Sequence, residues 1–411
     1  MPSVVIFRER LLPLSETFIR SQVSSLSKFK GIYAGCSRVS GLDLSPNPVV
    51  VMGTRMIGRA EEVALKTVHW APLLTARLAK YQPALLHAHF GPDGALALPL
   101  ARKLKLPLVT TYHGYDASQT DQTFKKDRRG RRYLQGRDAL KREASRFIAV
   151  SDFIARKLVD QGFPCEKIQV HYIGVDTVQF QPDPAVIREK MILFVGRLVP
   201  KKGCEYLIRA MEAVQMEMPD AELVILGDGP LRTALEKQAK AVLRRFRFLG
   251  AQSSAAVRDW MTRASVLCTP SIIDESGDAE GFGIVFIEAQ VCGLPVVSFL
   301  SGGIPEAVAH GETGYLAPEK DWRSLSRYLV ILLKNEEVWK RFSCAGRERV
   351  KKLFDVRRQT EKLERIYEDV IHCGKLQISG EEDRRGLVNN RTSSLYENKI
   401  NIGNYTNAES A

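Results

Sequence analysis

Short apolar segments alternate with longer amphipathic segments along most of the chain, and this alternation constrains the fold more than any other feature. Nine segments have the length and composition of buried strands, and nearly all are bounded by glycine, proline or a helix-like segment: 3–7, 84–88, 107–111, 146–150, 168–172, 191–196, 222–227, 265–269 and 295–299. Strands that alternate with helices are typical of βαβ units and parallel sheets. We therefore expect an α/β fold.

The strand series is interrupted once, over the proline-containing polar segment 174–190, and restarts at Met191. A chain of 411 residues is also too long for one typical core. We predict two doubly wound, Rossmann-like domains with a cleft between them. The predicted boundaries are 1–180 for the N-terminal domain, 181–190 for a linker, 191–340 for the C-terminal domain, 341–374 for helices that pack back toward the N-terminal domain, and 375–411 for a disordered tail.

The composition indicates a cytoplasmic enzyme-sized protein. The sequence contains no run of 18 apolar residues and does not begin with a charged leader followed by a hydrophobic region. Its seven cysteines are scattered and form no C-x-x-C pair. We therefore expect no membrane-spanning helix, no secretion, no disulfide framework and no zinc site.

The net positive charge is concentrated in the first half of the chain. Residues 1–185 hold 27 of the 60 Lys and Arg but only 16 of the 47 Asp and Glu, and the densest run is 125–146. One interpretation is a solvated helix face, and the other is a surface that meets anionic lipid headgroups or a phosphate-bearing partner. Tyr133 is the single aromatic residue in the run, so the stacking platforms of nucleic-acid binding are missing and no nucleic-acid partner is expected.

Cations and glycines follow two strands of the second series. The strand 191–196 runs into GRLVPKKG, which places Arg197 and Lys202 at a strand-to-helix turn. Two cations there could neutralise a diphosphate without a metal, although an ordinary basic turn has the same composition. The strand 222–227 runs into GDGPLR, where Arg232 occupies the third glycine position of a dinucleotide fingerprint, so a nicotinamide or flavin cofactor is disfavoured.

The segment EGFGIVFIEAQVCGLP, which begins at Glu280, places two carboxylates eight residues apart. Residues 284–291 predict a helix whose first amides follow Gly281, Phe282 and Gly283, and such a helix start attracts anions. Glu288 lies about two turns beyond Glu280, inside this apolar helix, and a carboxylate accepts hydrogen bonds from a vicinal diol well. A buried salt bridge is the alternative explanation for Glu288.

Three histidines fall at the ends of two predicted strands of the first series. They are His87 and His89 at the end of 84–88 and His113 after 107–111. A third metal ligand at a known spacing is missing, so a structural or acceptor-lining role is favoured over metal binding. His113, just before a glycine, is the best candidate for contact with a reacting centre.

In combination, these motifs resemble the retaining glycosyltransferases of family 4, which have the two-domain GT-B fold. The motifs that carry the resemblance are GRLVPKKG (196–203), LGDGPLR (226–232), EGFGIVFIEAQVCGLPVV (280–297) and SGGIPEAV (301–308), and the resemblance covers about 1–372. LPLSETFI (12–19) and HAHFGPDGALALPLARKLKLPLVTTYHG (87–114) are similar to the branch that builds exopolysaccharides, including colanic-acid-type enzymes.

The resemblance implies a role for each matching residue. Arg197 and Lys202 would bind the diphosphate of a nucleotide-sugar, and Glu280 would contact the donor sugar beside the amides of Gly281, Phe282, Gly283 and Ile284. Glu288 would bind the ribose, and His113 would lie beside the donor sugar. Ser15, Glu16 and Thr17, with His87 and His89, would line the acceptor side. Many family members have a Gly-Gly pair in the first loop, whereas this chain reads RERLLPLSET, which argues against a backbone cradle for phosphate there.

The implied activity is a retaining hexosyltransferase that moves a sugar from a nucleotide-sugar to a lipid-linked or oligosaccharide acceptor. Because no D-x-D motif occurs, no metal and no other cofactor is expected. The expected location is the cytoplasm, with peripheral attachment to the inner face of the cell membrane. A nucleotide-sugar epimerase on the same fold and an inactive basic binding protein are the alternatives. The sequence does not specify the sugar, nucleotide, acceptor, linkage or oligomeric state.

Overall fold

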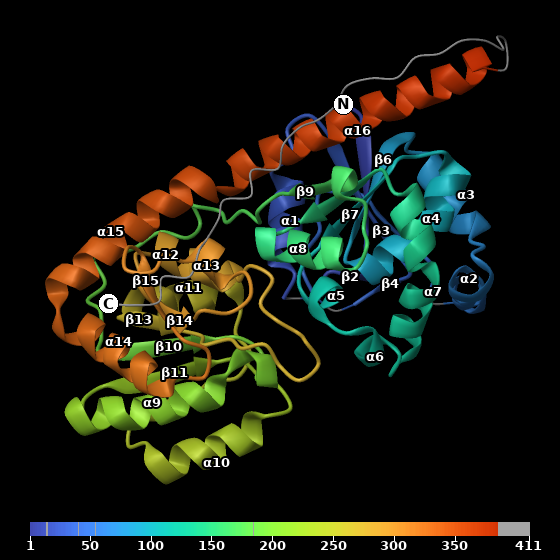
Figure 1. The fold of residues 1–411 in the computed structure, drawn as a ribbon. Coiled ribbons are helices and arrows are strands. Elements are labelled where there is room, and N and C mark those ends of the chain that lie inside the picture. Colours follow the sequence, from blue (N-terminus) through green and yellow to red (C-terminus); the bar gives the residue numbers. More distant parts are fainter. Residues whose placement is uncertain (14, 40, 54, 184, 385–411) are drawn as a thin grey trace. The chain divides into compact units, whose positions relative to one another are not determined.

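The computed structural model describes residues 1–384 except 14, 40, 54 and 184 (Figure 1). Met1–Ile371 form one compact unit, and a second unit begins at His372. The first unit contains two parallel sheets with helices around each, which we call the first lobe (β1–β9) and the second lobe (β10–β15). The expected α/β class with two Rossmann-like domains is confirmed.

The first lobe is built on a seven-stranded parallel sheet with the order β5-β3-β1-β6-β7-β8-β9. Its strands are β1 (Ser3–Phe7), β3 (Lys30–Gly35), β5 (Val49–Val51), β6 (Pro83–His89), β7 (Leu108–Tyr112), β8 (Arg146–Ala149) and β9 (Ile168–Val170). A separate pair is formed by β2 (Arg10–Leu11) and β4 (Ser37–Arg38). The register places Ile6 of β1 beside both Tyr33 and His87.

The helices of the first lobe connect these strands. They are α1 (Thr17–Ser24), α2 (Met56–Val68), α3 (Pro72–Ala79), α4 (Gly91–Leu104), α5 (Tyr115–Ser118), α6 (Asp121–Phe124), α7 (Arg128–Glu143), α8 (Asp152–Asp160) and the 3₁₀ helix η1 (Cys165–Lys167). Side-chain caps begin several of them. Asp127 accepts from the Gly130 amide at the start of α7, and Ser151 accepts from the Ile154 amide at the start of α8.

The second lobe has a six-stranded parallel sheet with the order β12-β11-β10-β13-β14-β15. Its strands are β10 (Met191–Val195), β11 (Glu222–Leu226), β12 (Phe246–Phe248), β13 (Val266–Cys268), β14 (Val296–Phe299) and β15 (Gly314–Ala317). Its helices are η2 (Pro200–Lys202), α9 (Cys204–Glu217), α10 (Arg232–Val242), α11 (Ser254–Arg263), α12 (Ile284–Val291), α13 (Ile304–Ala307), α14 (Trp322–Lys334) and α15 (Glu336–Leu353).

The strand orders place a switch point in each sheet. In the first lobe the chain leaves β1 toward β3 and later returns on the other side to β6, and in the second lobe it leaves β10 toward β11 and returns to β13. Ligands of doubly wound sheets bind outside the carboxyl ends of the strands at such points. The segments that follow β1, β6 and β7, and those that follow β10 and β13, are therefore the ones positioned for function.

The last helix, α16 (Val356–Arg384), contacts the first lobe through its first four turns. One core cluster joins α16 to the first sheet: Val4, Ile6, Ile19 and Val23 pack with Leu363, Ile366, Tyr367 and Val370. The tail was predicted to begin at 375, but the helix continues through Arg384. Residues 385–411 of that predicted tail lie outside the described residues.

All nine predicted strands are present, within one or two residues at each end. Six strands were not predicted: β2, β3, β4, β5, β12 and β15. Among the residues described, no helix has both the length and the apolar character needed to cross a bilayer.

Candidate active site

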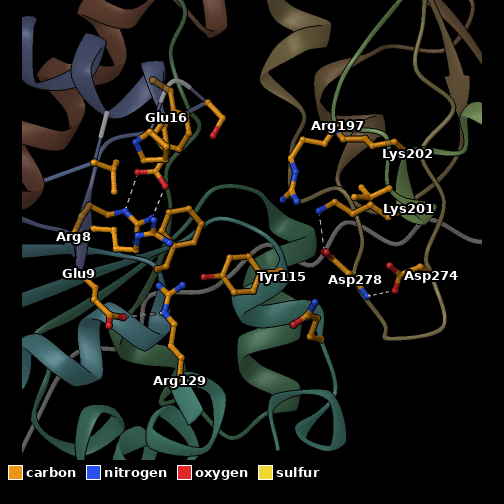
Figure 2. Close-up of a pocket in the computed structure, with 18 of the residues that line it drawn as sticks. Arg8, Glu9, Glu16, Tyr115, Arg129, Arg197, Lys201, Lys202, Asp274 and Asp278 are labelled. Carbon is orange, nitrogen blue, oxygen red and sulfur yellow. Dashed lines mark hydrogen bonds and ion pairs between the residues drawn. The ribbon is translucent and has the colours of Figure 1, made fainter. Parts of the chain in front are cut away.

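A cavity of about 960 Å³ is lined by the segments at both switch points. Figure 2 shows its two sides facing each other, with Arg8, Glu16, Tyr115 and Arg129 of the first lobe opposite Arg197, Lys201, Lys202 and Asp278 of the second. Of the predicted site residues, Arg197, Lys202, Ser15 and Glu16 are among those that line it. A cavity of this size accommodates a ligand of several hundred daltons.

Lys202 and Glu280 form an ion pair on the second-lobe side. Lys202 ends the short helix η2 that follows β10, and its Nζ bonds the Glu280 carboxylate, which also accepts a hydrogen bond of 3.3 Å from the Ser271 hydroxyl. Burial disfavours the charged form of Glu280, but Lys202 and Lys201 outweigh burial and lower its pKa to about 2. Glu280 is therefore a carboxylate throughout the physiological pH range.

The loop between β13 and α12 supplies two more acidic residues to the cavity. Lys201 Nζ lies 3.0 Å from Asp278 Oδ1, and the Asp278 amide donates to Asp274. The same loop reaches the first lobe, where the Thr120 amide donates to the Ser276 carbonyl over 3.1 Å. On the second-lobe side, two lysines are thus each held by an ion pair with a carboxylate: Lys201 with Asp278 and Lys202 with Glu280.

Arg197 is exposed at the carboxyl end of β10, and no carboxylate of the described residues pairs with its guanidinium. In Figure 2 its side chain points toward the cavity beside Lys201. An arginine that keeps its hydrogen-bond donors unused is available to bind a carboxylate or phosphate in a bidentate manner.

The turn that begins α12 is built by close backbone contacts. A Cβ atom at Gly281 would lie 2.0 Å from the His113 carbonyl oxygen, so only glycine allows this approach between the lobes. Gly283 is the residue before α12, with a φ of 84° and no side-chain cap on the helix. Phe282 is buried and packs its ring against Tyr172 and Phe354, so its side chain belongs to the core and only its backbone faces the turn.

Glu288 lies on α12 between buried neighbours and is itself only partly exposed. Burial raises the pKa of its carboxyl group to about 7. No described residue donates a hydrogen bond to its carboxylate, so the predicted alternative of a buried salt bridge is not supported.

The first-lobe wall is organised around the buried Arg8, which directly follows β1. Its guanidinium bonds Glu16 and Asp93 and lies 4.2 Å from the centre of the Phe90 ring. Arg129 extends the network, with Nη2 2.6 Å from Asp93 and Nε 3.2 Å from Glu9. Arg8, Glu9, Glu16, Asp93 and Arg129 thus compensate one another's charges.

This network changes the interpretation of the first loop. Glu16 was expected to bind the acceptor, but both of its carboxylate oxygens accept from Arg8, so it positions Arg8 instead. Ser15 lines the cavity as expected. Thr17 begins α1 and is not among the lining residues.

The three predicted histidines have different environments. His87 is fully buried, and its ring nitrogens lie 2.6 Å from the Tyr367 hydroxyl and 2.7 Å from the Thr111 hydroxyl, so it has no surface to offer an acceptor. His89 is also buried, and its Nδ1 lies 3.1 Å from Nε2 of His113. Of the three, His113 alone is partly exposed, and its carbonyl group contacts the Gly281 turn.

Burial and neighbouring charges keep the histidine rings neutral. Burial, together with the charge of Arg8, lowers the pKa of His113 well below its usual value, and burial has the same effect on His89. Burial lowers the pKa of His87 to about 3. All three are uncharged hydrogen-bonding groups at neutral pH.

The basic run 125–146 contains α7 (Arg128–Glu143), and much of its charge is paired with carboxylates of the first lobe. Arg129 pairs with Asp93 and Glu9, Arg132 with Glu9, and Arg137 with Asp121. Arg128 and Arg131 remain exposed. Arg129 and Arg132 of this run thus support the cavity wall, and the exposed cations of the run are the ones left for the predicted contact with anionic lipid or phosphate, which stays a prediction.

Sequence reasoning did not assign seven of the cavity residues labelled in Figure 2 to the site: Arg8, Glu9, Tyr115, Arg129, Lys201, Asp274 and Asp278. Arg8 could have been found, since it directly follows the strand 3–7 in the way that His113 follows β7. Lys201 neighbours a predicted site residue. Asp278 lies in a loop with no strand or helix signal that would have singled it out.

Comparisons with known proteins agree with the family and the fold. The family described as "Glycosyl transferases group 1" matches residues 177–349, and "Glycosyltransferase Family 4" matches residues 36–179. The WcaL protein of Escherichia coli (strain K12), named as a colanic acid biosynthesis glycosyltransferase, is 34% identical over 252 residues, which is 59% of this chain and 60% of that protein. The chain thus matches less than two thirds of this relative's length.

A second relative is covered more fully. The amylovoran biosynthesis glycosyltransferase AmsK of Erwinia amylovora is 30% identical over 72% of this chain and 73% of its own length. Among solved structures, HepE of Anabaena in complex with UDP-glucose has a TM-score of 0.73 at 18% identity, over 90% of this chain and all of that one. This structural similarity supports the fold.

Proposed function

This chain belongs to the family 4 glycosyltransferases, and on that premise we propose that it transfers a sugar from a nucleoside diphosphate sugar with retention of anomeric configuration. The acceptor would be a lipid-linked or oligosaccharide chain in the synthesis of an exopolysaccharide. The relatives named above for colanic acid and amylovoran synthesis support this class of product.

One observation carries the proposal. Arg197, without a carboxylate partner among the described residues, stands beside the Lys202–Glu280 pair at the carboxyl ends of β10 and β13, facing a cavity that both lobes line. A nucleotide-sugar places a diphosphate between a sugar and a ribose, and it needs cations at the diphosphate and acceptors at both ends. Arg197 and Lys202 suit the diphosphate, Glu280 the sugar and Glu288 the ribose.

The chemistry follows from these assignments. The bond between the sugar C1 and the diphosphate breaks through an oxocarbenium-like transition state, and negative charge grows on the departing diphosphate. Arg197, Lys202 and the amides at the start of α12 stabilise that charge, so we propose that transfer needs no metal ion. The acceptor hydroxyl forms the new bond on the same face and gives its proton to the departing diphosphate.

Glu280 is assigned as a stabiliser and not as a nucleophile. Its carboxylate is held by Lys202 and Ser271, and the Lys202 pair keeps it ionised. In that position it accepts hydrogen bonds from the donor-sugar hydroxyls. The His113 carbonyl, in contact with the Gly281 turn, would lie beside the same sugar.

The acceptor would approach from the first-lobe wall, past Ser15. A lipid-linked acceptor stays in its membrane during the reaction, so we propose that the enzyme works in the cytoplasm at the inner membrane face. Its partners would be the nucleotide-sugar donor, the lipid-linked saccharide and the anionic membrane surface.

Thermal unfolding with UDP-glucose and GDP-mannose, in the presence and absence of EDTA, tests the donor assignment. A donor at about a hundred times its dissociation constant should add roughly 2.7 kcal/mol to the free energy of unfolding. EDTA should not change the shift. Lys202→Met should lower the transfer rate by roughly 10²–10³-fold, whereas Lys190→Met, which removes an exposed lysine paired with Asp220, should not.

Each of these experiments has an outcome that would contradict the proposed function or the role of Lys202. No stabilisation by any nucleotide-sugar would favour the inactive binding protein. Interconversion of the donor sugar without transfer would favour the epimerase. Near-normal transfer by Lys202→Met would remove Lys202 from the diphosphate site.

A further inference from the structure

Exposed apolar side chains are concentrated on two consecutive helices of the first lobe. Of the 17 large hydrophobic residues found exposed among the described residues, seven lie between residues 56 and 81. Six of them form what we call the α2–α3 apolar surface: Met56, Ile57, Val63, Val68, Trp70 and Leu73. The remaining ten are spread over the rest of the described chain, as expected for a soluble surface.

The pattern of burial shows that α2 turns an apolar face outward. Gly58, Glu61 and Leu65 are its buried positions, one helical face of the element. Met56 and Val63 lie opposite them and are 86% and 61% exposed. Surface helices ordinarily present polar residues on that face, so an apolar outer face indicates a partner.

Neither acidic residue of this region stands as a fully exposed, unpaired charge. Glu61 is buried and accepts hydrogen bonds from the Leu73 and Leu74 amides, which hold the start of α3 against α2. Glu62 pairs with Lys66. In contrast, Arg55, Arg59 and Lys80 are exposed. The outer face of α2–α3 therefore combines apolar and basic side chains without an exposed acid.

We propose that the α2–α3 apolar surface docks on an anionic lipid bilayer. Apolar side chains that enter the headgroup boundary, flanked by cations that meet anionic lipid, are the features of an interfacial helix. A second copy of this chain would bring Arg55 and Arg59 close to their own counterparts, and such like-charge contacts oppose association. The bilayer satisfies both the apolar and the basic side chains.

The position of α2 connects this surface to the cavity. Lys66 of α2 lies 2.6 Å from Glu9, and Glu9 lines the cavity. A bilayer on the outer face of α2 would thus lie on the acceptor side of the site. This placement rests on the proposed function, because it gives a lipid-linked acceptor a short path from the membrane to the first-lobe wall.

Co-sedimentation with phosphatidylglycerol–phosphatidylcholine vesicles tests the surface in the full chain. We expect binding to these vesicles and much weaker binding to phosphatidylcholine alone. Met56→Ser with Val63→Ser and Trp70→Ser should weaken binding at least roughly tenfold, and Arg55→Gln with Arg59→Gln roughly tenfold to thirtyfold. The matched control is Ile187→Ser with Met216→Ser, which removes two apolar residues exposed elsewhere and should bind normally.

Trp70 gives a direct spectroscopic readout. All four tryptophans lie within the described residues, and Trp70 is the exposed one. Its fluorescence should shift to shorter wavelength on anionic vesicles, and the shift should be lost in Trp70→Phe while binding persists. Unchanged fluorescence of the wild-type protein on anionic vesicles would overturn the proposal.

Two further outcomes separate this surface from the catalytic assignment. The membrane proposal fails if the triple serine variant binds vesicles like the wild type. It also fails if the wild-type protein does not bind vesicles but forms a dimer in sedimentation velocity that the triple variant does not form. If vesicle binding follows the prediction but no nucleotide-sugar stabilises the protein, the proposed function fails and the docking surface stands. Stabilisation by the donor should be the same in the triple variant and the wild type.

Discussion

Glu288 has a pKa that the fold shifts into an experimentally accessible range. Burial raises its pKa to about 7, above its unfolded value of about 4.5. Below pH 4.5 it is protonated in both states and has no effect on stability. As the pH rises toward 7 the unfolded chain loses the proton first, so the free energy of unfolding falls, and it stays lower above pH 7.

Glu288→Gln removes this penalty. The variant should be more stable than the wild type by about 1–3 kcal/mol at pH 8 and equally stable at pH 4, as measured by urea unfolding. If the ionised carboxylate binds ribose, the same variant should bind UDP more weakly at pH 8. Glu361→Gln, at an exposed position of α16, is the control and should show no such pH dependence. A constant stability difference at both pH values would show that burial does not raise the Glu288 pKa.

The site residues that could be predicted from sequence are those whose position in the chain determines their place in the fold. Arg197 and Lys202 follow a recognisable strand, so a parallel sheet places them at its functional edge. The environment of His87 was not predictable, because its ring partner Tyr367 lies 280 residues away. The role of Glu16 was not predictable either, because Glu16 binds Arg8, and Arg8 is held in a buried position by Asp93, which lies 85 residues further along the chain.

At the scale of the element, the strands that escaped prediction are short or interrupted. β2 and β4 have two residues each, and β5 and β12 have three. β3 contains two glycines, which weaken the strand signal, although it lies beside β1 inside the sheet. These segments have a weak intrinsic strand propensity, and pairing with neighbouring strands of the sheet stabilises them as strands.

The helices α8 and α13 join the two lobes through one side chain. Glu306 of α13 accepts hydrogen bonds from the Asp152 and Phe153 amides at the start of α8, over 2.7 and 2.9 Å. Nearby, the Ser151 hydroxyl donates to the Gly281 carbonyl over 2.5 Å. Glu306 therefore helps to set how closely the Gly281 turn approaches His113.

Glu306→Ala should lower the free energy of unfolding by about 1–3 kcal/mol, because two amides lose their acceptor. The transfer rate should fall more than the donor affinity, since the cations of the second lobe are intact. Glu306→Gln keeps one acceptor oxygen but places an NH2 group against the second amide, so it should restore only part of both properties. If the glutamine variant behaved like the wild type, a single acceptor oxygen would be enough, and the paired contact of Glu306 with both amides would not be what joins the lobes.

At the scale of the whole molecule, the last helix, α16, packs on the first lobe, which contains the N-terminus. Glu364 of α16 is buried and accepts from three consecutive amides of the first lobe, those of Ser27, Lys28 and Phe29, and from the Ser27 hydroxyl. These contacts span more than 330 residues. Because they tie the last helix to the first lobe, the two lobes within Met1–Ile371 should unfold together.

Glu364→Ala tests this coupling. Loss of a charged acceptor shared by four donors should cost about 3–5 kcal/mol, and calorimetry should then show the first lobe unfolding ahead of the second in place of one transition. Glu368→Ala, one turn further along α16, removes an exposed pair with Lys28 at 2.7 Å and should cost less than about 1 kcal/mol. A single transition in Glu364→Ala, shifted no further than in Glu368→Ala, would mean that the apolar contacts of Leu363, Ile366 and Tyr367 alone unite the molecule.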